Sequence, residues 1–342
     1  MFLRNAWYVA ASDRDVGAGL VPTTVLGEAI VMYRKLDGDV AALEDACPHR
    51  KLPLSMGRLK GDEVDCGDHG LTFDCCGACV RSTGAEHIPP SARVRTYPLE
   101  SRYGLLWIWM GDADQADPAT IFRVEHWGDP AWSLNQGDTT EVACNDRYST
   151  DNLLDPSRVT WVHPTWFAGA ACDDAPLEAT VAGNGATVSR WMNGVDAAPF
   201  CAPFLKFAGR CDRKPQYEVR FPSHAAINAV FTAAGSGGDG AAPHPEIFIT
   251  DSYNRMTPID ANNTKRYGFQ MRSFAPGDAQ VSQRFADSER AAFDEDRVIL
   301  GAVHKGMANT RTPNIDPQTD NGPLRLRRRL AQLIAAEQPL PA

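Results

Sequence analysis

Short apolar segments separated by Gly, Pro and Asp make up the first third of the chain, and each is only long enough for a β-strand. The clearest of these segments lie at residues 40–44, 71–74 and 105–110. The densest apolar run of the whole chain, YGLLWIWM at residues 103–110, also has the length of a strand. This pattern predicts a small all-β domain in the N-terminal part of the chain.

A polar segment, GDADQADPA at residues 111–119, ends this pattern and is the best candidate for a linker. We therefore expect a first domain at residues 1–115 and a second domain at residues 116–342. The sequence contains no internal repeat and no low-complexity tract, so neither domain is expected to be a repeat array or a disordered tail.

The second part of the chain mixes helical and strand patterns. Between residues 141 and 168 the pattern is helical and is interrupted by Pro156 and Pro164, because proline ends or kinks a helix. Strand patterns follow at residues 187–192, 216–221, 226–231, 246–251 and 266–274. The pattern is helical again at about 279–307 and 323–336. Strands followed by terminal helices predict an α+β domain built on a central antiparallel sheet.

Composition and charge exclude several classes of protein. The 342 residues carry a net charge of −9, from 43 acidic and 34 basic side chains, whereas a strong nucleic-acid-binding protein needs a positive surface. No stretch approaches the roughly 18 apolar residues of a membrane span. The N-terminal sequence MFLRNAWYVAAS lacks the apolar region of a signal peptide, so we expect a cytoplasmic protein that binds neither nucleic acid nor membrane.

Nine cysteines in such a compartment are expected to be metal ligands or buried thiols, because disulfides are rare there and an odd number cannot pair completely. The pattern C-x-H at residues 47–49 is followed, after sixteen residues, by C-x-x-H at residues 66–69. In a Rieske 2Fe–2S cluster two cysteine thiolates hold one iron and two histidine imidazoles hold the other. The candidate ligands are Cys47, His49, Cys66 and His69.

A zinc site is the main alternative, but zinc motifs usually pair Cys with Cys and His with His. Gly67 and Gly70 support a cluster, because glycine lets the backbone of the second loop approach the sulfides closely. Cys75, Cys76 and Cys79 form a C-C-x-x-C pattern that could be a separate metal or redox site. We interpret them as small thiols in a strand and turn beside the cluster.

Four segments together resemble the oxygenase components of the Rieske non-haem iron oxygenases, in particular the vanillate O-demethylase and dicamba monooxygenase subgroup. The segments are NAWYVAA, CGDHGLTFD, GLLWIWMGD and DNLLDPS. The resemblance covers nearly the whole chain and implies a Rieske domain followed by a catalytic domain of the helix-grip type. It also implies a monooxygenase that hydroxylates or demethylates a small, usually aromatic, substrate with O2. The substrate itself does not follow from the sequence.

The resemblance further implies a mononuclear iron(II) bound by two histidines and a carboxylate, with open positions for chemistry. The second histidine is His163, but Arg158 stands where the family has the first. Arginine stays protonated and has no lone pair for a metal, so Arg158 should not bind iron. Arg158 is an engineered substitution, a natural feature of a silent subunit, or a departure for which another residue compensates. His304 is a candidate for such a replacement.

Helical spacing alone does not bring positions 158 and 163 together, because five residues on an ideal helix place two side chains about 140° apart. They converge only if the helix bends or ends between them, and Pro164 favours an ending near His163.

The carboxylate ligand can be sought on the helix at 279–307, where Asp296 lies in an apolar stripe. That stripe consists of Ala292, Phe293, Ile299, Leu300 and Val303. A carboxylate on a buried face is costly unless it is paired or binds a metal, so Asp296 is the predicted ligand and a buried ion pair is the alternative. Asp294, Glu295 and Arg297 are expected to face solvent.

Asp155 and Asn152 are the remaining candidate catalytic residues. By resemblance, Asp155 links a cluster histidine, His69 of one subunit, to the iron site of the next, which requires a ring-like trimer or hetero-oligomer. Asn152 is expected to line the same pocket or, alternatively, to cap a helix. A separate reductase with a flavin and a plant-type 2Fe–2S cluster would supply electrons. The rival interpretation is a silent electron-transfer or structural subunit of a hetero-oligomeric oxygenase.

Overall fold

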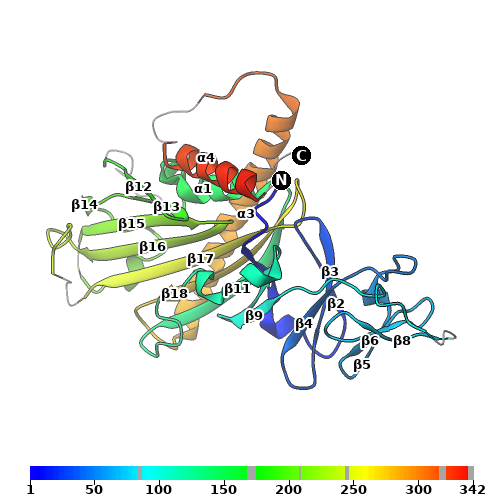
Figure 1. The fold of residues 1–342 in the computed structure, drawn as a ribbon. Helices are drawn as coiled ribbons and strands as arrows, with labels where there is room; N and C mark the ends of the chain where they lie inside the picture. The colour runs from blue at the N-terminus through cyan, green and yellow to red at the C-terminus, as the bar shows by residue number, and fades with distance from the viewer. Residues whose placement is uncertain (84–86, 168–174, 208, 243–245, 316–320, 338–342) are drawn as a thin grey trace. The chain divides into compact units, whose positions relative to one another are not determined.

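The computed structural model describes residues 1–342 except 84–86, 168–174, 208, 243–245, 316–320 and 338–342 (Figure 1). The chain divides into two compact units. The first unit contains Met1–Ile121, Thr257–Ala261 and Glu337, and the second contains Phe122–Met256 and Asn262–Ala336. The segment predicted as a linker belongs to the first unit, where it forms two short 3-10 helices, η3 (Ala113–Gln115) and η4 (Pro118–Thr120).

The first unit consists of three small antiparallel sheets, as expected for an all-β Rieske domain. Their strand orders are β1-β10-β9, β2-β3-β4 and β5-β6-β7-β8. The strands are β1 (Trp7–Ser12), β2 (Val21–Val25), β3 (Glu28–Arg34), β4 (Val40–Glu44), β5 (Arg58–Lys60), β6 (Glu63–Asp65), β7 (Thr72–Phe73), β8 (Cys79–Arg81), β9 (Leu99–Arg102) and β10 (Leu105–Trp109). The predicted strands at 40–44, 71–74 and 105–110 correspond to β4, β7 and β10. Apolar side chains of β3, β4, β6 and β7 and of the loops between them form one core, which includes the two buried cysteines of the C-x-H and C-x-x-H patterns.

The second unit is built on an eight-stranded antiparallel sheet with the order β11-β18-β17-β16-β15-β13-β12, and β14 pairs separately with β15. Its strands are β11 (Ser133–Val142), β12 (Glu178–Ala182), β13 (Gly185–Ser189), β14 (Met192–Val195), β15 (Cys211–Arg220), β16 (His224–Ala233), β17 (Phe248–Pro258) and β18 (Thr264–Arg272). The sheet and its helices confirm the predicted α+β class. The segment predicted as one strand at 187–192 spans the break between β13 and β14.

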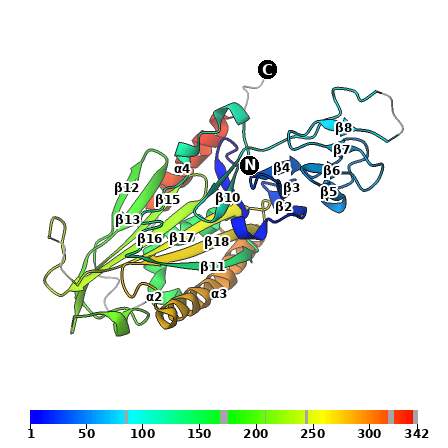
Figure 2. The same ribbon diagram turned by 90° about the horizontal axis from the view of Figure 1, so that it is seen from below.

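Helices cover the sheet of the second unit (Figures 1 and 2). The long helix α3 (Ala279–Asn309) lies along the sheet beside β11, and the carboxylate of Asp278 caps its N-terminus by accepting from two backbone N–H groups. The helices α1 (Asp146–Leu154) and α4 (Asn321–Ala336) share a second apolar core with β13, β15 and β16. None of the described helices is long and apolar enough to cross a membrane.

Asp146 begins α1 as a buried carboxylic acid, and burial raises its pKa to about 6. Because the folded protein holds this proton more tightly than the unfolded chain, stability should fall as pH rises from about 4 to about 6. We expect Asp146→Asn to be more stable than the wild type by up to about 3 kcal/mol above pH 6 and to differ less below pH 4. Urea unfolding of both proteins across this range measures the difference, and a pH-independent difference would contradict the assignment.

Candidate functional site

The two loops that carry the cysteine–histidine patterns share one backbone turn. In each loop the cysteine N–H donates to the carbonyl five residues later, at 2.9 Å for Cys47 and 2.8 Å for Cys66. The cysteine carbonyl accepts from the N–H four residues later, at 2.8 Å and 3.1 Å respectively. The residue at that fourth position has a left-handed conformation in both loops, with φ of 63° at Lys51 and 65° at Gly70. The loops therefore present their side chains in equivalent ways.

The candidate cluster ligands form a buried pair and an exposed pair. Cys47 and Cys66 are buried, and burial together with the neighbouring Cys66 thiol raises the pKa of Cys47. The rings of His49 and His69 lie at the surface with their centroids 4.5 Å apart and nearly perpendicular. The carboxylate of Asp68 lies 2.8 Å from Nδ1 of His69, which sequence analysis did not anticipate. The structure thus gathers all four predicted ligands at the tips of two loops.

Gly67 and Gly70 of the second loop are needed for different structural reasons. Gly70 supplies the left-handed turn, whereas Gly67 allows a close approach, because a Cβ there would lie 2.8 Å from the carbonyl oxygen of Met56. Gly67 is therefore required for packing between backbone segments of the same unit.

The C-C-x-x-C segment forms a tight turn, as interpreted from the sequence. Asp74 accepts hydrogen bonds from the N–H groups of Cys76 and Ala78, and Cys79 begins β8. Cys75 and Cys79 pack partly buried against the core, and Cys76 is exposed.

The segment after α1 positions the second group of candidate residues. Asp155 caps a single 3-10 turn, η5 (Pro156–Arg158), by accepting from the N–H of Ser157 at 2.9 Å and from its hydroxyl at 2.6 Å. One turn of helix, α2 (Val159–Val162), follows and ends at His163. The helix therefore changes type after position 158 and stops before position 163, as the convergence of these two side chains required.

Arg158 forms a two-pronged ion pair with Asp296 of α3. Its Nη1 lies 2.7 Å from Oδ1 and its Nη2 lies 3.2 Å from Oδ2 of that carboxylate. Its Nε donates to the carbonyl oxygen of Asn152 at 2.8 Å. Three hydrogen bonds in the fixed geometry of a guanidinium hold the cation firmly at this position.

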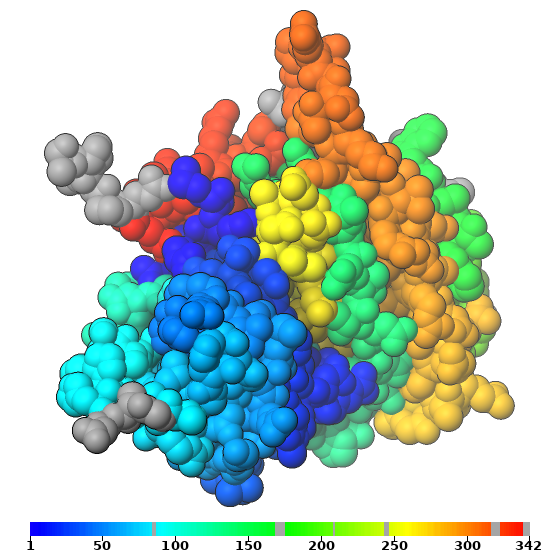
Figure 3. Space-filling view, turned by 90° about the vertical axis from the view of Figure 1, so that its right-hand side faces the viewer, coloured from blue at the N-terminus to red at the C-terminus, as the bar shows by residue number. Residues whose placement is uncertain are grey.

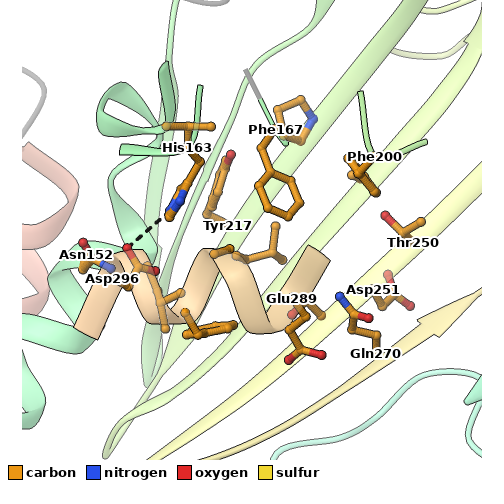
Figure 4. Close-up of a pocket in the computed structure, with 18 of the residues that line it drawn as sticks. Asn152, His163, Phe167, Phe200, Tyr217, Thr250, Asp251, Gln270, Glu289 and Asp296 are labelled. Carbon is orange, nitrogen blue, oxygen red and sulfur yellow. Dashed lines mark ion pairs between the residues drawn. The ribbon is translucent and has the colours of Figure 1, made fainter. Parts of the chain in front are cut away.

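His163 contacts two carboxylates of α3. Its Nε2 lies 3.3 Å from Oδ1 of Asp296 (Figure 4). Its Nδ1 lies 2.7 Å from Oε2 of Glu295. Burial opposes ionisation of Asp296, but His163 and Arg158 more than compensate and hold its pKa at about 2. Glu295 was predicted to face solvent, and its side chain is 36% exposed, but its carboxylate also reaches His163, which the sequence did not predict.

A cavity of about 130 Å³ lies between α3, the segment 152–167 and the sheet. Its wall is largely aromatic and aliphatic, and the rings of Phe167 and Phe200 lie 4.9 Å apart within it. Figure 4 shows Asn152, His163 and Asp296 at one end of the cavity and Thr250 and Gln270 toward the other. Asn152 lines this cavity, and so does Asp155. Asn145, not Asn152, caps α1.

Two family models match the chain. Residues 6–98 match the Rieske [2Fe-2S] domain, and residues 142–336 match the vanillate O-demethylase oxygenase C-terminal domain. This chain is a Rieske oxygenase component. The match confirms the resemblance drawn from the sequence and disfavours the zinc alternative for the first unit.

Several known proteins are similar to this chain over nearly its full length. The toluene-4-sulfonate monooxygenase system iron-sulfur subunit of Comamonas testosteroni is 34% identical over 98% of both chains. The vanillate O-demethylase oxygenase subunit of Pseudomonas sp. (strain HR199 / DSM 7063) is 32% identical over 99% of this chain and 96% of its own. The crystal structure of dicamba monooxygenase bound to 3,6-dichlorosalicylic acid has a TM-score of 0.89 at 28% identity, covering 98% of both chains. One dicamba monooxygenase structure contains non-haem iron, with a TM-score of 0.82 at 27% identity over 98% of both chains.

The side chains around Asp296 do not fit a mononuclear iron. Both carboxylate oxygens of Asp296 accept hydrogen bonds from Arg158, and a guanidinium in that position repels a divalent metal. Among the described residues, His163 is the one imidazole on this cavity. His304 does not line it, and its ring lies 5.7 Å from that of Tyr148. The observed arrangement is the buried ion pair that was the alternative interpretation of Asp296.

Proposed function

We propose that this chain accepts electrons on a Rieske 2Fe–2S cluster bound by Cys47, His49, Cys66 and His69. The observation that carries the proposal is the pairing of two buried thiols with two exposed imidazoles on loops of equivalent conformation. This donor set fits the cluster, which would supply one-electron transfer. The exposed histidine pair gives the electrons a short path to and from the surface.

The partners of this electron transfer follow from the family. We propose a separate reductase with a flavin and a plant-type 2Fe–2S cluster as donor, acting in the cytoplasm. We also propose the boundaries 1–115 for the Rieske domain and 116–342 for the catalytic domain, supported by the main segment of the first compact unit, which ends at Ile121. Relatives named for vanillate, dicamba and toluene-4-sulfonate act on substituted benzene rings, which supports a small aromatic compound as the ligand of the cavity.

The Arg158–Asp296 pair favours a particular role for this oxygenase component. A chain that hydroxylates or demethylates in its own cavity needs iron at His163 and Asp296, and Arg158 prevents this. A silent subunit that passes electrons to another chain does not need a mononuclear iron of its own. We propose that this chain, with arginine at position 158, serves as such a silent subunit. The oxygen chemistry of the family would then take place in another chain that has histidine at this position.

Passing electrons to another chain requires an oligomer. We propose a ring-like trimer or hetero-oligomer in which His69 of one subunit meets Asp155 of the next. The last turns of α3 support an interface, because the apolar side chains of Val298, Val303 and Met307 are exposed there. In Figure 3 this end of α3 is part of the orange segment that stands out from the surface of the second unit. Sedimentation equilibrium that gives the mass of one chain at micromolar concentration would contradict this assembly.

Iron analysis together with electron paramagnetic resonance of the purified, anaerobically loaded protein tests the proposed role. We expect about two irons per chain and a reduced-state signal typical of mixed Cys and His ligation. About three irons would contradict the closed mononuclear site, because a third iron requires ligands that Arg158 displaces. Zinc in place of iron, or a signal typical of ligation by four cysteines, would contradict the cluster.

A further inference from the structure

Arg213 is a cation that lines the cavity but, among the described residues, lacks the ion-pair partner that some other charged residues of this cavity have. Arg158 pairs with Asp296, and Glu289 pairs with a buried arginine of β18, Arg266. In the described part of the chain, no carboxylate lies within ion-pair distance of Arg213, although the residue is only 7% exposed. Its Nη1 is buried and has no hydrogen-bond partner there.

The alternation of β15 explains why this cation faces the cavity. Arg213, Pro215 and Tyr217 lie on one face of the strand and line the cavity. Lys214 points to the opposite face, where its Nζ lies 2.8 Å from Asp239. Arg213 is opposite Phe231 of β16, and its guanidinium carbon lies 6.0 Å from the centroid of that ring.

The protein contacts of Arg213 satisfy only part of the hydrogen-bonding capacity of its guanidinium and do not balance its charge. Nη2 donates to the carbonyl oxygen of Phe167 at 3.4 Å, which is a long hydrogen bond, and the contact with Phe231 involves no acceptor. Burying a guanidinium without a counter-charge is strongly unfavourable, so a purely structural cation at this site would be costly. An anion that enters the cavity would remove this cost.

We propose that Arg213 binds the acidic group of an aromatic acid, a carboxylate or a sulfonate, in this cavity. The forked guanidinium donates two parallel hydrogen bonds to either group, which is why the structure points to their shared chemistry. The inference rests on the proposed function only in taking this cavity as the ligand pocket of the oxygenase component.

The position of Phe167 gives the bound acid an orientation. Its carbonyl oxygen accepts from Arg213, and its ring centroid lies 5.9 Å from that of His163. The aromatic rings of Phe167 and Phe200 therefore flank the space between the cation and the His163–Asp296 pair. A ligand whose acidic group is held by Arg213 directs the opposite side of its benzene ring toward His163.

Isothermal titration calorimetry of the whole protein with three probes of similar shape tests this inference. The probes are 4-methylbenzoate, toluene-4-sulfonate and the neutral 4-methylbenzamide. We expect at least one of the two acids to bind more tightly than the amide. In Arg213→Gln the affinity for that acid should fall on the order of 10- to 100-fold, because hydrogen bonds to a charged group are lost. The affinity for the amide should stay within about twofold, and Arg213→Lys should be intermediate.

The amide serves as a control for folding, since a misfolded Arg213→Gln protein would lose all three probes. Lys214→Gln removes the same charge from the other face of the strand and should leave all affinities unchanged. The inference is overturned if the wild type prefers the amide or binds none of the probes, or if Arg213→Gln keeps the preference for the acid. A preference for one acid over the other identifies which group the site accepts. Binding needs neither iron nor reductase, so a failed iron analysis and a failed titration are separate results.

Discussion

Replacing Arg158 with histidine is expected to raise the iron content of the protein from about two to about three atoms per chain. The substitution removes the cation that holds both oxygens of Asp296 and adds an imidazole at the position that the family uses. His163 is already oriented for this task, because Glu295 accepts at its Nδ1 and leaves Nε2 directed at Asp296. A site with two histidines and one carboxylate would result.

The iron content of Arg158→His should be measured after anaerobic loading with ferrous iron, beside two matched variants. Arg158→Leu removes the cation without adding a ligand and should stay at about two irons, while losing about 3 kcal/mol of stability because Asp296 loses a buried partner. Arg158→His combined with Asp296→Asn should also stay at about two. If Arg158→His gains no iron, the segment from Asp155 to His163 has been interpreted wrongly, and other residues form the family's iron site.

Oxygen uptake and formaldehyde release should then be measured for Arg158→His, with a compatible reductase and methoxylated or methylated aromatic acids. Activity would show that the Arg158–Asp296 ion pair alone prevents this chain from acting as a monooxygenase. The wild type is expected to give neither under the same conditions. Activity in the wild type at a comparable rate would contradict the proposed silent role.

Replacing Cys47 or Cys66 with serine is expected to abolish the cluster, with loss of essentially all iron and of visible absorbance. Both thiols are buried in a core of the first unit, so this unit should also lose several kcal/mol of stability, since the binding energy of a metal site contributes to folding. The second unit has its own cores and should keep its thermal transition.

Cys76→Ser is the matched control, because Cys76 lies in the same unit but is exposed in the turn before β8. It should retain full iron content and an unchanged reduced-state signal. If Cys76→Ser removes the cluster as Cys66→Ser does, the C-C-x-x-C segment supplies ligands and the pairing of two cysteines with two histidines is incorrect.

The sequence predicted the features that depend on local spacing. The cluster ligands lie on two short loops, so a motif of a few residues was sufficient to find each half. The antiparallel sheet followed from a series of strand patterns succeeded by terminal helices, and α3 followed from its long helical pattern. Strand β11 was missed because its buried face includes polar side chains, Ser133 and Asn135, and so lacks apolar alternation.

The site around Asp296 could be predicted only in part, because its contacts are distant in sequence. Arg158 and Asp296 are separated by 138 residues, and the periodicity of a sequence predicts no contact between residues so far apart. Helical periodicity found the buried carboxylate but not the contact between Glu295 and His163, since the stripe describes the side of α3 that faces the sheet and not the flank that meets His163. Ile299 and Val303 were counted in the stripe but are exposed. Arg213 gave no signal, because a single cation on a strand normally indicates a solvent face.

The ion pair between Arg158 and Asp296 has a consequence for how the protein is made. A buried carboxylate needs a balancing charge, which a bound metal can supply. Here the balancing charge is part of the polypeptide and is present as soon as the chain is synthesised. We therefore expect the second unit to fold independently of iron supply, and a cell short of iron to accumulate chains that lack only the cluster.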